Sequence, residues 1–560
     1  MVLAAEVCNT PTMELNIADA FEAIEQVVGD RECIVSGGRS FTWARTGERM
    51  HRFAAVLLDA GLGRVVDRSG LAGWESGQDH VALYLHNGNE YLEAMFGSYV
   101  VRCAPVNVNY RYRAAELAYV LSDSRSRVIV YHGAFGDTLA EVAGSLPELS
   151  LLLRVEDGSG VEPVPGSVDY EDALGTADPA AARGIVRSPD DLYLCYTGGT
   201  TGRPKGVLWR QADFLVSALG VRRRDGSDHE SLDELAAAAR SSSLRALPAP
   251  PLMHGAAHWN AISAWLAGGT VIIQSETARL DPADIWRTVQ DQRATSLLIV
   301  GDPFARPLLD EWDRAAAAGS PYDASSLRHI LSGGAILSPG TKQQVLDRLP
   351  HLTVVDVLGS SESGRQGVSQ TASGDDTTTP FAPSATSVVL AEDRSERLDA
   401  GDHRIGWLAQ TGRVPLGYLD DESKTSATFP VIDSVRYAVA GDRARLDDHG
   451  NIVLLGRDSV TINTGGEKVF AEEVETALKA HPAVFDAVVC GRPSQRWGQE
   501  VVGIVALRPG FEATDEDLVA HCGTELAGFK LPKAIIRLPH VERSPSGKAD
   551  YSWATGIAAR

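Results

Sequence analysis

A glycine- and threonine-rich segment, residues 196–207 with the sequence YTGGTTGRPKGV, combines residue types that hold phosphate groups. Glycines allow successive backbone N–H groups to turn toward one point, and such a nest binds phosphate oxygens. The threonine hydroxyls add donors, and Lys205 adds a compact positive charge. An apolar run at residues 192–195 precedes the segment and predicts a buried strand that leads into it. The segment therefore predicts a phosphate-binding loop.

The order of residues in this loop differs from that of a P-loop NTPase. A Walker A loop requires Gly directly before the lysine and Ser or Thr directly after it. Here Pro204 precedes Lys205, and Gly206 follows it. A kinase or a P-loop NTPase is therefore disfavoured.

Lysine is scarce in this chain, which has 8 Lys among its 52 basic residues and none before Lys205. A chain that uses Arg for most of its positive charge keeps Lys where an ammonium group is needed. Lys548, in the segment PSGK at residues 545–548, is a second such position. The two lysines are candidates for chemistry on anionic groups.

Further motifs follow in a fixed order along most of the chain. They are NYRYRAAELAYVLS at 109–122, PLMHG at 251–255, SGGA at 332–335, LGSSESG at 358–364, AGD at 440–442, GRDSVTINTGGEKVFAEEVE at 456–475 and PSGK at 545–548. With the glycine-rich loop, this order resembles the adenylate-forming enzymes, which comprise acyl-CoA synthetases, luciferases and peptide-synthetase adenylation domains. The sequence looks most like the actinobacterial fatty-acid and steroid side-chain CoA ligases.

The resemblance implies an ATP-dependent acyl-CoA synthetase, an AMP-forming acid–thiol ligase. Such an enzyme joins a hydrophobic carboxylic acid to the α-phosphate of ATP, releases pyrophosphate and passes the acyl group to coenzyme A. The implied cofactors are ATP, Mg²⁺ and coenzyme A. Catalysis of phosphoryl chemistry is mostly positioning and electrostatic stabilisation. The segments around residues 256–265, 301–305 and 332–335 are small or apolar and are expected to line the acyl pocket.

The resemblance also assigns roles to residues that match its motifs. The expected catalytic residues are Lys548, bridging the carboxylate and the α-phosphate, with Glu362, His254 and Lys205. Mg²⁺ is assigned to Thr201 and Glu362, because this hard ion prefers oxygen ligands and phosphate. The remaining residues assigned to ATP and coenzyme A are Thr197, Gly198, Gly199, Thr200, Gly202, Gly334, Ala335, Ser361, Asp442, Arg457, Gly465, Gly466 and Glu467. Among these, Asp442 suits the ribose hydroxyls, and Gly334 and Ala335 offer a flat, small surface for adenine. Residues 465–467 are expected to line a tunnel for pantetheine.

Three positions depart from the family pattern. Ser459 stands where a hinge Asp or Lys is usual, Asn463 where Lys is frequent, and Leu358 where an aromatic ring often faces adenine. Two alternatives also stay open. One is a fatty-acyl-AMP ligase that loads a carrier-protein thiol, and the other is a nucleotide- or lipid-binding relative without turnover.

Composition limits the partners and the compartment. The formal charge of −22 argues against a nucleic-acid binder, which carries basic stripes. Six scattered cysteines without a CxxC pair indicate a reducing cytoplasm. The first residues lack the basic start of a secretory signal, and no apolar run reaches the length of a membrane span. We expect a cytoplasmic enzyme of small molecules, with peripheral membrane contact and a homodimer left open.

The elements that position these motifs alternate between apolar strands and amphipathic helices, which predicts an α/β fold. The expected strands include residues 81–85, 127–131, 270–273 and 296–300, with helices at 89–101 and 282–292. Residues 62–80, 155–190 and 371–380 are expected to be loops, and residues 222–245 a surface insertion or a lid. We expect paired strands at 437–456 and, after them, a compact α+β pattern. The predicted domains are residues 1–457, which bind AMP and the acyl group, and residues 458–560, a small mobile lid.

Overall fold

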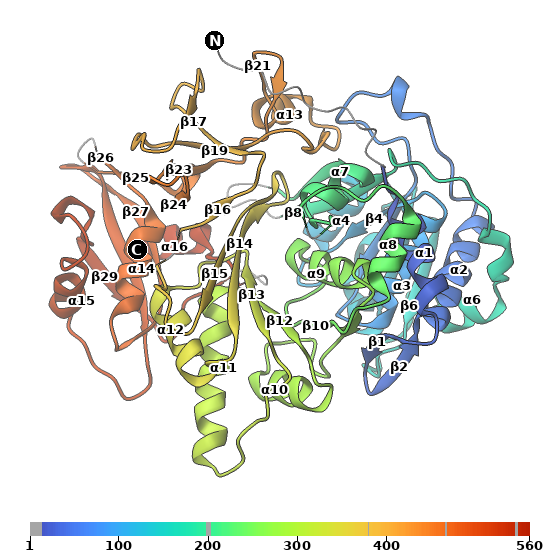
Figure 1. The fold of residues 1–560 in the computed structure, drawn as a ribbon, viewed down its shortest axis with the longest axis horizontal. Coiled ribbons are helices and arrows are strands. Elements are labelled where there is room, and N and C mark those ends of the chain that lie inside the picture. The colour runs from blue at the N-terminus through green and yellow to red at the C-terminus, as the bar shows by residue number, and fades with distance from the viewer. Residues whose placement is uncertain (1–13, 198–202, 224, 379, 465–466, 544–546) are drawn as a thin grey trace. The chain divides into compact units, whose positions relative to one another are not determined.

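The computed structural model describes residues 14–197, 203–223, 225–378, 380–464, 467–543 and 547–560 (Figure 1). The chain forms two compact units. Unit 1 comprises Met1–Cys195, Leu208–Ala246 and His258–Ile273, and unit 2 comprises Tyr196–Val207, Leu247–Ala257 and Gln274–Arg560. The chain passes from unit 1 to unit 2 within β8 (Leu192–Thr197) and returns within β9 (Lys205–Arg210). Both units mix helices with sheets, which confirms the predicted α/β class.

Unit 1 contains a parallel sheet in the order β4-β3-β5-β6-β7. Its strands are β3 (His80–Tyr84), β4 (Ala104–Asn107), β5 (Ser126–His132), β6 (Leu151–Val155) and β7 (Val168–Asp169). All five residues of β3 are buried, as expected for an apolar strand with both faces covered. The helices between these strands are α3 (Asn89–Val100), α4 (Ala114–Asp123) and α5 (Gly136–Ala143). The strands predicted at 81–85 and 127–131 and the helix predicted at 89–101 are confirmed.

Helix α3 is buried on all sides and nevertheless carries a carboxylate. Glu93 is fully buried, and its Oε1 accepts a hydrogen bond from Arg49 Nε at 2.8 Å. Arg49 lies on α2 (Trp43–Asp59), which packs against α3, and it also pairs with Glu171. A buried charge requires such a partner. The pair therefore ties α2 to the helix that covers the parallel sheet.

Two of the predicted loops differ in outcome. Residues 62–80 form a loop before β3, with a short 3₁₀ turn, Arg68–Gly70, and an isolated bridge between Val65 and Gln78. The prediction of a loop at 155–190 is partly wrong, because this segment contains β7, α6 (Tyr170–Thr176) and the turn Pro179–Ala182. Helix α6 starts where the Asp169 side chain accepts from two backbone N–H groups, and Tyr170 is buried. These capping and core residues outweigh the polar composition of the segment.

A second group of strands, which belongs to unit 1 except for the last two residues of β10, pairs in the order β10-β11-β1-β2. The strands are β1 (Glu32–Ser36), β2 (Arg39–Thr42), β10 (Arg245–Pro248) and β11 (Thr270–Ile272), and the last confirms the strand predicted at 270–273. Helix α8 (Leu232–Ala239) lies within the predicted insertion and packs against α1 (Ile17–Val28). Leu235, Ala236 and Ala239 of α8 are buried. This packing within unit 1 supports a surface insertion for residues 222–245.

Unit 2 contains the parallel strands β12 (Ser296–Ile299), β13 (His329–Gly333) and β14 (Thr353–Ser360), followed by the antiparallel β15 (Gly364–Ala372) and β16 (Ala382–Pro383). The helices of this part are α10 (Pro282–Asp291), α11 (Gly301–Ala317) and α12 (Pro339–Arg348). Helix α10 begins with Pro282 after the cap Asp281, a sequence that favours a helix start. The strand predicted at 296–300 and the helix predicted at 282–292 are confirmed.

An antiparallel sheet in the order β18-β17-β19-β23-β24 continues unit 2. Its strands are β17 (Ser387–Leu390), β18 (Arg397–Leu398), β19 (Gly406–Gln410), β23 (Asp442–Leu446) and β24 (Ile452–Arg457). Strands β23 and β24 are the predicted pair within residues 437–456. Nearby in the sequence lie β20 (Gly417–Tyr418) and α13 (Glu422–Thr428). The domain boundary at residue 457 stays a prediction.

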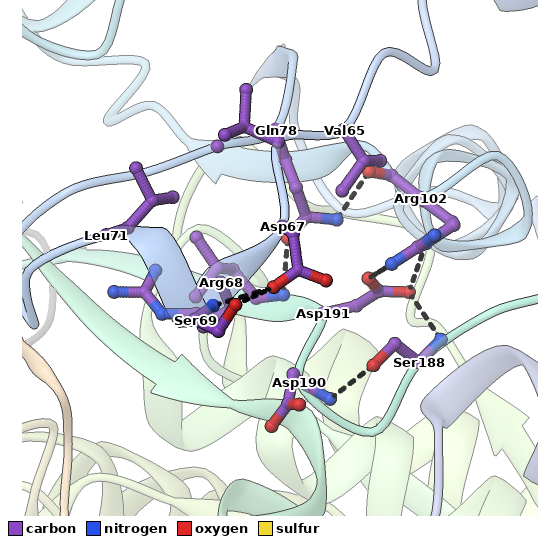
Figure 2. Close-up of a pocket in the computed structure, with 13 residues that line it drawn as sticks. Val65, Asp67, Arg68, Ser69, Leu71, Gln78, Arg102, Ser188, Asp190 and Asp191 are labelled. Atoms are coloured by element: carbon purple, nitrogen blue, oxygen red, sulfur yellow. Dashed lines mark hydrogen bonds and ion pairs between the residues drawn. The ribbon is translucent and has the colours of Figure 1, made fainter.

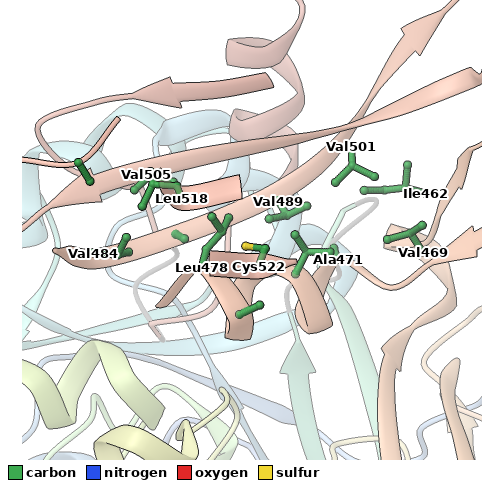
Figure 3. Packing of buried hydrophobic residues seen from close by; sticks show 14 of the residues in the cluster. Ile462, Val469, Ala471, Leu478, Val484, Val489, Val501, Val505, Leu518 and Cys522 are labelled. Atoms are coloured by element: carbon green, nitrogen blue, oxygen red, sulfur yellow. The ribbon is translucent and has the colours of Figure 1, made fainter. Parts of the chain in front are cut away.

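The last part of unit 2 is a sheet with helices on both faces, drawn in orange and red in Figure 1. It contains β25 (Ile462–Thr464), β26 (Glu467–Val469), β27 (Val484–Ser494), β28 (Gly498–Leu507) and β29 (Ala534–Arg537), with α14 (Ala471–Ala480), α15 (Asp515–Cys522) and α16 (Tyr551–Ala558). Side chains of β28 alternate between two cores. Val501 and Val505 join the core of α14 and α15 shown in Figure 3, and Val502 and Ile504 join the core of α16. This arrangement confirms the predicted α+β pattern.

Among the described residues, no helix combines the length and the apolar character that crossing a membrane requires.

Candidate active site

The predicted phosphate-binding loop connects two neighbouring strands of one sheet. Thr197 is the last residue of β8, and Lys205 is the first residue of β9. A Walker A loop leads into a helix instead, so the structure agrees with the exclusion made from the sequence. Gly198, Gly199, Thr200, Thr201 and Gly202 lie outside the described residues.

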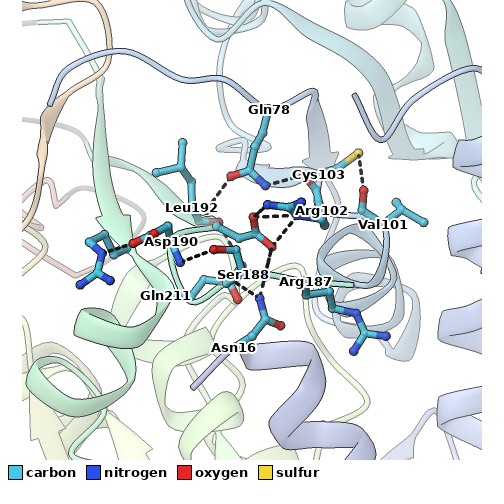
Figure 4. Close-up of polar contacts among 12 residues, drawn as sticks. Asn16, Gln78, Val101, Arg102, Cys103, Arg187, Ser188, Asp190, Leu192 and Gln211 are labelled. Atoms are coloured by element: carbon cyan, nitrogen blue, oxygen red, sulfur yellow. Dashed lines mark hydrogen bonds and ion pairs between the residues drawn. The ribbon is translucent and has the colours of Figure 1, made fainter. Parts of the chain in front are cut away.

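The beginning of β8 is fixed by a buried carboxylate in unit 1 (Figure 4). Asp191 accepts hydrogen bonds from Arg102 Nη2 at 2.8 Å, from the backbone N–H of Ser188 at 3.1 Å and from Asn16 Nδ2 at 3.4 Å. The backbone N–H of Leu192 then donates to Gln78 Oε1 at 2.6 Å. These bonds anchor the strand whose other end carries Thr197.

Lys205 lies among residues that the sequence analysis did not single out. Its ammonium pairs with the Asp421 carboxylate at 2.5 Å and lies 5.6 Å from the centre of the Tyr418 ring. Asp421 also caps α13, since its side chain accepts from the backbone N–H of Lys424. Burial opposes ionisation of Asp421, but the bond from Lys205 and the cap together lower its pKa. Lys205 is therefore paired with an ionised carboxylate.

Glu362 joins this group through the same tyrosine. It lies in the turn between β14 and β15, next to Ser361, and its Oε1 accepts a hydrogen bond from the Tyr418 hydroxyl at 3.1 Å. Burial raises the pKa of Tyr418, so the phenol stays protonated and can only donate to the carboxylate. The structure thus brings the predicted Lys205 and Glu362 to the same tyrosine, Lys205 near its ring and Glu362 at its hydroxyl. The sequence signal for this tyrosine was the GYLDDE segment at residues 417–422, which the analysis passed over.

Asp442 and Arg457 lie opposite each other on β23 and β24. Arg457 Nε is 3.2 Å from Asp442 Oδ1, and this carboxylate is the main cause of a raised pKa of Arg457. The backbone N–H of Arg457 donates to Glu472 Oε1 at 3.3 Å. Burial, with a smaller effect of Glu475, raises the pKa of Glu472 to about 7. The two residues assigned to the nucleotide are therefore in contact, and a partly buried acid, which the sequence did not indicate, supports them.

Lys548 lies beside the SGGA segment, although more than 200 residues separate them in sequence. A Cβ built on Gly334 would be 3.7 Å from Lys548 Cε. Gly334 has φ +85°, a conformation that favours glycine, and Ala335 follows it. The structure therefore brings the lysine and the predicted adenine surface together.

Arg543 holds the segment that carries this lysine. Its guanidinium donates to both oxygens of Asp486 at 2.6 Å, and its Nη1 donates to the carbonyl of Gly547 at 3.1 Å. Both side chains are nearly buried, with 12% and 14% exposure. The arginine thus fixes the carbonyl directly before Lys548, a role that its position two residues before the PSGK motif did not reveal.

The structure shows few contacts for the remaining predicted site residues. Glu467 begins β26 and lines a cavity of about 710 Å³ in unit 2, whereas Gly465 and Gly466 lie outside the described residues. His254 lies in a turn, where its backbone N–H donates to the Pro251 carbonyl at 3.0 Å. The role of His254 stays a prediction.

The positions that depart from the family pattern are also placed. Leu358 is buried in the core cluster of the antiparallel sheet, Ser459 lies in a 3₁₀ turn after β24, and the backbone N–H of Asn463 donates to Gln499 Oε1 at 2.9 Å.

Unit 1 contains a separate cavity of about 240 Å³ between residues 65–78 and 188–192 (Figure 2). Its charged side chains already have partners in the protein. Arg102 pairs with Asp191, and Arg68 donates to the carbonyls of Glu75 and Ala72. The loop at residues 62–80 is joined to the start of β8 by the bond from the Leu192 backbone N–H to Gln78 Oε1.

Groups of three or more His, Cys, Asp or Glu side chains able to hold a metal ion are not found among the described residues. Mg²⁺ in nucleotide sites is usually held by one or two carboxylates and by phosphate oxygens. Glu362, oriented by Tyr418, offers such a carboxylate. Its partner in the prediction, Thr201, lies outside the described residues.

Comparisons with known proteins agree with this geometry. Residues 21–409 match the AMP-binding enzyme model, and residues 473–548 match the AMP-binding enzyme C-terminal domain model. The chain is 47% identical to the medium-chain acyl-CoA ligase Mig of Mycobacterium avium, covering 97% of this chain and 98% of the relative. It is 38% identical to a 3-oxocholest-4-en-26-oate–CoA ligase of Rhodococcus rhodochrous, covering 97% and 96%.

Solved structures extend the similarity to the fold. The anthranilate CoA ligase AuaEII in complex with anthranoyl-AMP matches with a TM-score of 0.81 at 20% identity, over 97% of both chains. ATP-bound MatB from Rhodopseudomonas palustris matches with a TM-score of 0.77 at 24% identity, over 97% of this chain and 99% of the other. The predicted adenylate-forming membership is confirmed, and the chain belongs to the AMP-binding enzyme family.

Proposed function

We propose that this enzyme is an ATP-dependent acyl-CoA synthetase that activates a hydrophobic carboxylic acid. The proximity of Lys548 to Gly334 carries the proposal, because it brings an ammonium group to the surface expected to hold adenine. The high identity to acyl-CoA ligases over nearly the whole chain supports the same reaction.

In the first step a carboxylate oxygen attacks the α-phosphorus of ATP, and the bond to the bridging oxygen of pyrophosphate breaks. The carboxylate is already ionised, so this step requires no general base. Negative charge spreads over the phosphoryl oxygens in the transition state. We assign Lys548 to the carboxylate and the α-phosphate, where a positive charge stabilises that transition state. Asp442 accepts from the ribose hydroxyls, and Arg457 keeps Asp442 ionised and oriented.

The outer phosphates are assigned to the glycine-rich loop, Thr197 and Lys205. Lys205 now pairs with Asp421, so phosphate must take the place of this carboxylate. Such an exchange keeps the ammonium paired with an anion throughout. Mg²⁺, when bound by Glu362, neutralises phosphate charge and orients the leaving pyrophosphate. Tyr418 holds the carboxylate ready for this role.

In the second step a thiolate attacks the acyl carbonyl, and AMP leaves with the electron pair of the broken C–O bond. Residues 465–467 are assigned to the path of pantetheine. The cavity that Glu467 lines also contains four basic side chains, those of Arg443, Arg445, Lys468 and Lys530. Three acidic side chains share this lining, so the net charge is positive. A positive cavity beside the proposed path suits the phosphates of coenzyme A.

Small and apolar residues in the proposed acyl pocket favour a fatty acid or a sterol side-chain acid. The names of the relatives refer to medium-chain acids and to 3-oxocholest-4-en-26-oate, and both are hydrophobic carboxylic acids. We further propose that the enzyme acts in the cytoplasm, because the five described cysteines are buried and are not in disulfides. A homodimer and peripheral membrane contact are tested by light scattering and by flotation with vesicles.

The proposal is tested by a screen for acid-dependent pyrophosphate release. Short, medium and long fatty acids and sterol side-chain acids are supplied with ATP, Mg²⁺ and coenzyme A, and acyl-CoA is measured by mass spectrometry. We expect pyrophosphate and acyl-CoA in equal amounts with at least one hydrophobic acid. Acyl-AMP without acyl-CoA would favour transfer to a carrier-protein thiol. Neither product with any acid would contradict the proposal and favour a binding protein without turnover.

A further inference from the structure

Helix α11 presents a row of charged side chains on one face. Asp302, Arg306 and Asp310 follow each other at intervals of four residues, so they lie on the same side of the helix. The charges of this row alternate in sign. Residues near the junction of α14 and β27 meet the row with complementary groups. Lys479 Nζ is 3.9 Å from Asp302 Oδ2, and Arg508 Nη1 is 3.5 Å from Asp310 Oδ1.

Arg306, in the middle of the row, is bonded to the backbone of that junction. Its Nη1 donates to the carbonyls of Val484 at 3.0 Å and Phe485 at 2.7 Å, and its Nη2 donates to the carbonyl of Lys479 at 3.0 Å. The carbonyl of Lys479 belongs to the last turn of α14, where carbonyls have no partner within the helix. A cation is favourable at this negative end of a helix.

The position of Arg306 makes these bonds strong. Its side chain is 8% exposed, and the nearest carboxylate, Asp302 Oδ2, lies at 3.4 Å with 2% exposure. Water therefore competes little for the carbonyls, and hydrogen bonds from a charged donor are about twice as strong as neutral ones. The contact at Asp310 is half exposed and contributes less. Arg306 is thus the main polar link between α11 and the start of β27.

A continuous series of contacts leads from this link to Lys548. The residue after Phe485 is Asp486, which holds Arg543 through two hydrogen bonds, and Arg543 in turn donates to the carbonyl of Gly547. Gly547 itself packs against the start of α11. A Cβ built on Gly547 would be 3.4 Å from Val300 Cγ1 and 3.6 Å from Pro303 Cβ. The same helix therefore contacts both ends of the series.

We propose that Arg306 is a positioning residue for adenylate formation, which it serves by holding the start of β27 so that Asp486 and Arg543 place Lys548 beside Gly334. The inference rests on the proposed function, in which Lys548 acts on the carboxylate and the α-phosphate. Arg306 contacts no substrate and acts only through the lysine.

The test compares Arg306→Met, which keeps the length of the side chain and removes its donors, with Arg314→Met. Arg314 lies on the same helix, is 65% exposed and pairs with Glu311 three residues before it, so its variant is the matched control. We expect Arg306→Met to lower the single-turnover rate of pyrophosphate release at least tenfold, with the KM for ATP unchanged within threefold. Arg306→Lys, which keeps the charge, should recover part of the rate. Formation of acyl-CoA from supplied acyl-AMP should change less than threefold.

A double-mutant cycle distinguishes positioning from general damage to the fold. In a Lys548→Ala background, Arg306→Met should change pyrophosphate release less than twofold, because the group on which it acts is gone. Equal losses with and without Lys548, or equal losses in both half-reactions, would overturn the proposal. Melting temperatures identify a variant that fails to fold, and Arg306→Lys then completes the cycle in its place.

Hydrogen–deuterium exchange tests the link between Arg306 and the segment of Lys548 without an activity measurement. Arg306→Met should speed amide exchange in residues 547–560 relative to Arg314→Met, and unchanged exchange there would overturn the proposal. A parent protein that releases no pyrophosphate with any acid would contradict the proposed function. The exchange result would still decide whether Arg306 positions the segment of Lys548.

Discussion

Replacing Tyr418 by phenylalanine removes one oxygen atom from the centre of the proposed phosphate site. Tyr418 is 4% exposed, and its ring packs against Phe429, so the phenylalanine ring keeps these apolar contacts. The hydrogen bond from the hydroxyl to Glu362 Oε1, 3.1 Å long, is lost, together with the contact of the hydroxyl to the Thr428 side chain. The loss at Glu362 is the one that bears on a carboxylate, and the dependence on Mg²⁺ reports it.

The size of the effect follows from the type of bond. A hydrogen bond to an ionised group contributes about 1.5–3 kcal/mol. If that contribution is needed in full when Glu362 holds Mg²⁺ in the transition state, the rate falls by roughly 10- to 150-fold, since about 1.4 kcal/mol corresponds to a factor of ten. Part of the loss should be recovered at high Mg²⁺ concentration, because a poorly oriented ligand binds the ion more weakly.

The assay is acid-dependent exchange of labelled pyrophosphate into ATP over a range of Mg²⁺ concentrations. Tyr437→Phe is the matched control, because Tyr437 is also buried and its hydroxyl accepts a hydrogen bond from Arg397 in a different cluster. We expect exchange to fall for Tyr418→Phe alone and its Mg²⁺ dependence to shift to higher concentration. Exchange within twofold of the parent at all Mg²⁺ concentrations would refute the assignment of Glu362 to the metal.

Three further substitutions test other parts of the site. Lys548→Ala should lower adenylate formation by orders of magnitude and spare acyl-CoA formation from supplied acyl-AMP, and equal loss in both half-reactions would count against its role. Arg543→Met leaves the Asp486 carboxylate without its cation and should lower the free energy of unfolding by about 3 kcal/mol, as measured by urea denaturation. Adding Asp486→Asn to the same chain should partly restore the free energy of unfolding. Burial raises the pKa of Glu472 to about 7, so ionisation costs the native state stability as the pH rises from about 4.5 through 7. Glu472→Gln should remove this loss. The free energy of unfolding should therefore rise by up to about 3 kcal/mol at pH 8 and change little near pH 5. An equal effect at both pH values would show that the Glu472 carboxyl does not titrate between them.

The residue pattern predicted those parts of the fold in which burial repeats regularly. The strand predicted at residues 81–85 is confirmed as β3, because an uninterrupted apolar run is typical of a strand with both faces covered, and all five residues of β3 are buried. Residues 155–190 misled the prediction, because a single buried tyrosine, Tyr170, and a capping aspartate are enough to form α6 within a polar segment. Local composition does not report such a tertiary contact.

The residues of the candidate site were likewise predicted only in part from the sequence. Lys205, Glu362, Asp442 and Lys548 stand in recognisable motifs, so their types and order were visible in the sequence. Their partners were not visible, because a partner is defined by a distance in space. Asp421 lies 216 residues from Lys205, and Arg306 lies 178 residues from Val484. The sequence thus predicted the candidate site residues, and the structure was needed to find the residues that contact them.

The central claim is that the enzyme cleaves ATP between its α- and β-phosphates to activate an acid. Counting the nucleotide products formed with each molecule of acyl-CoA, by chromatography of a reaction with the best acid of the screen, tests this claim most directly. We predict one AMP and one pyrophosphate for each acyl-CoA, with neither product formed when the acid is omitted. ADP and inorganic phosphate in stoichiometric amounts with acyl-CoA would contradict the account.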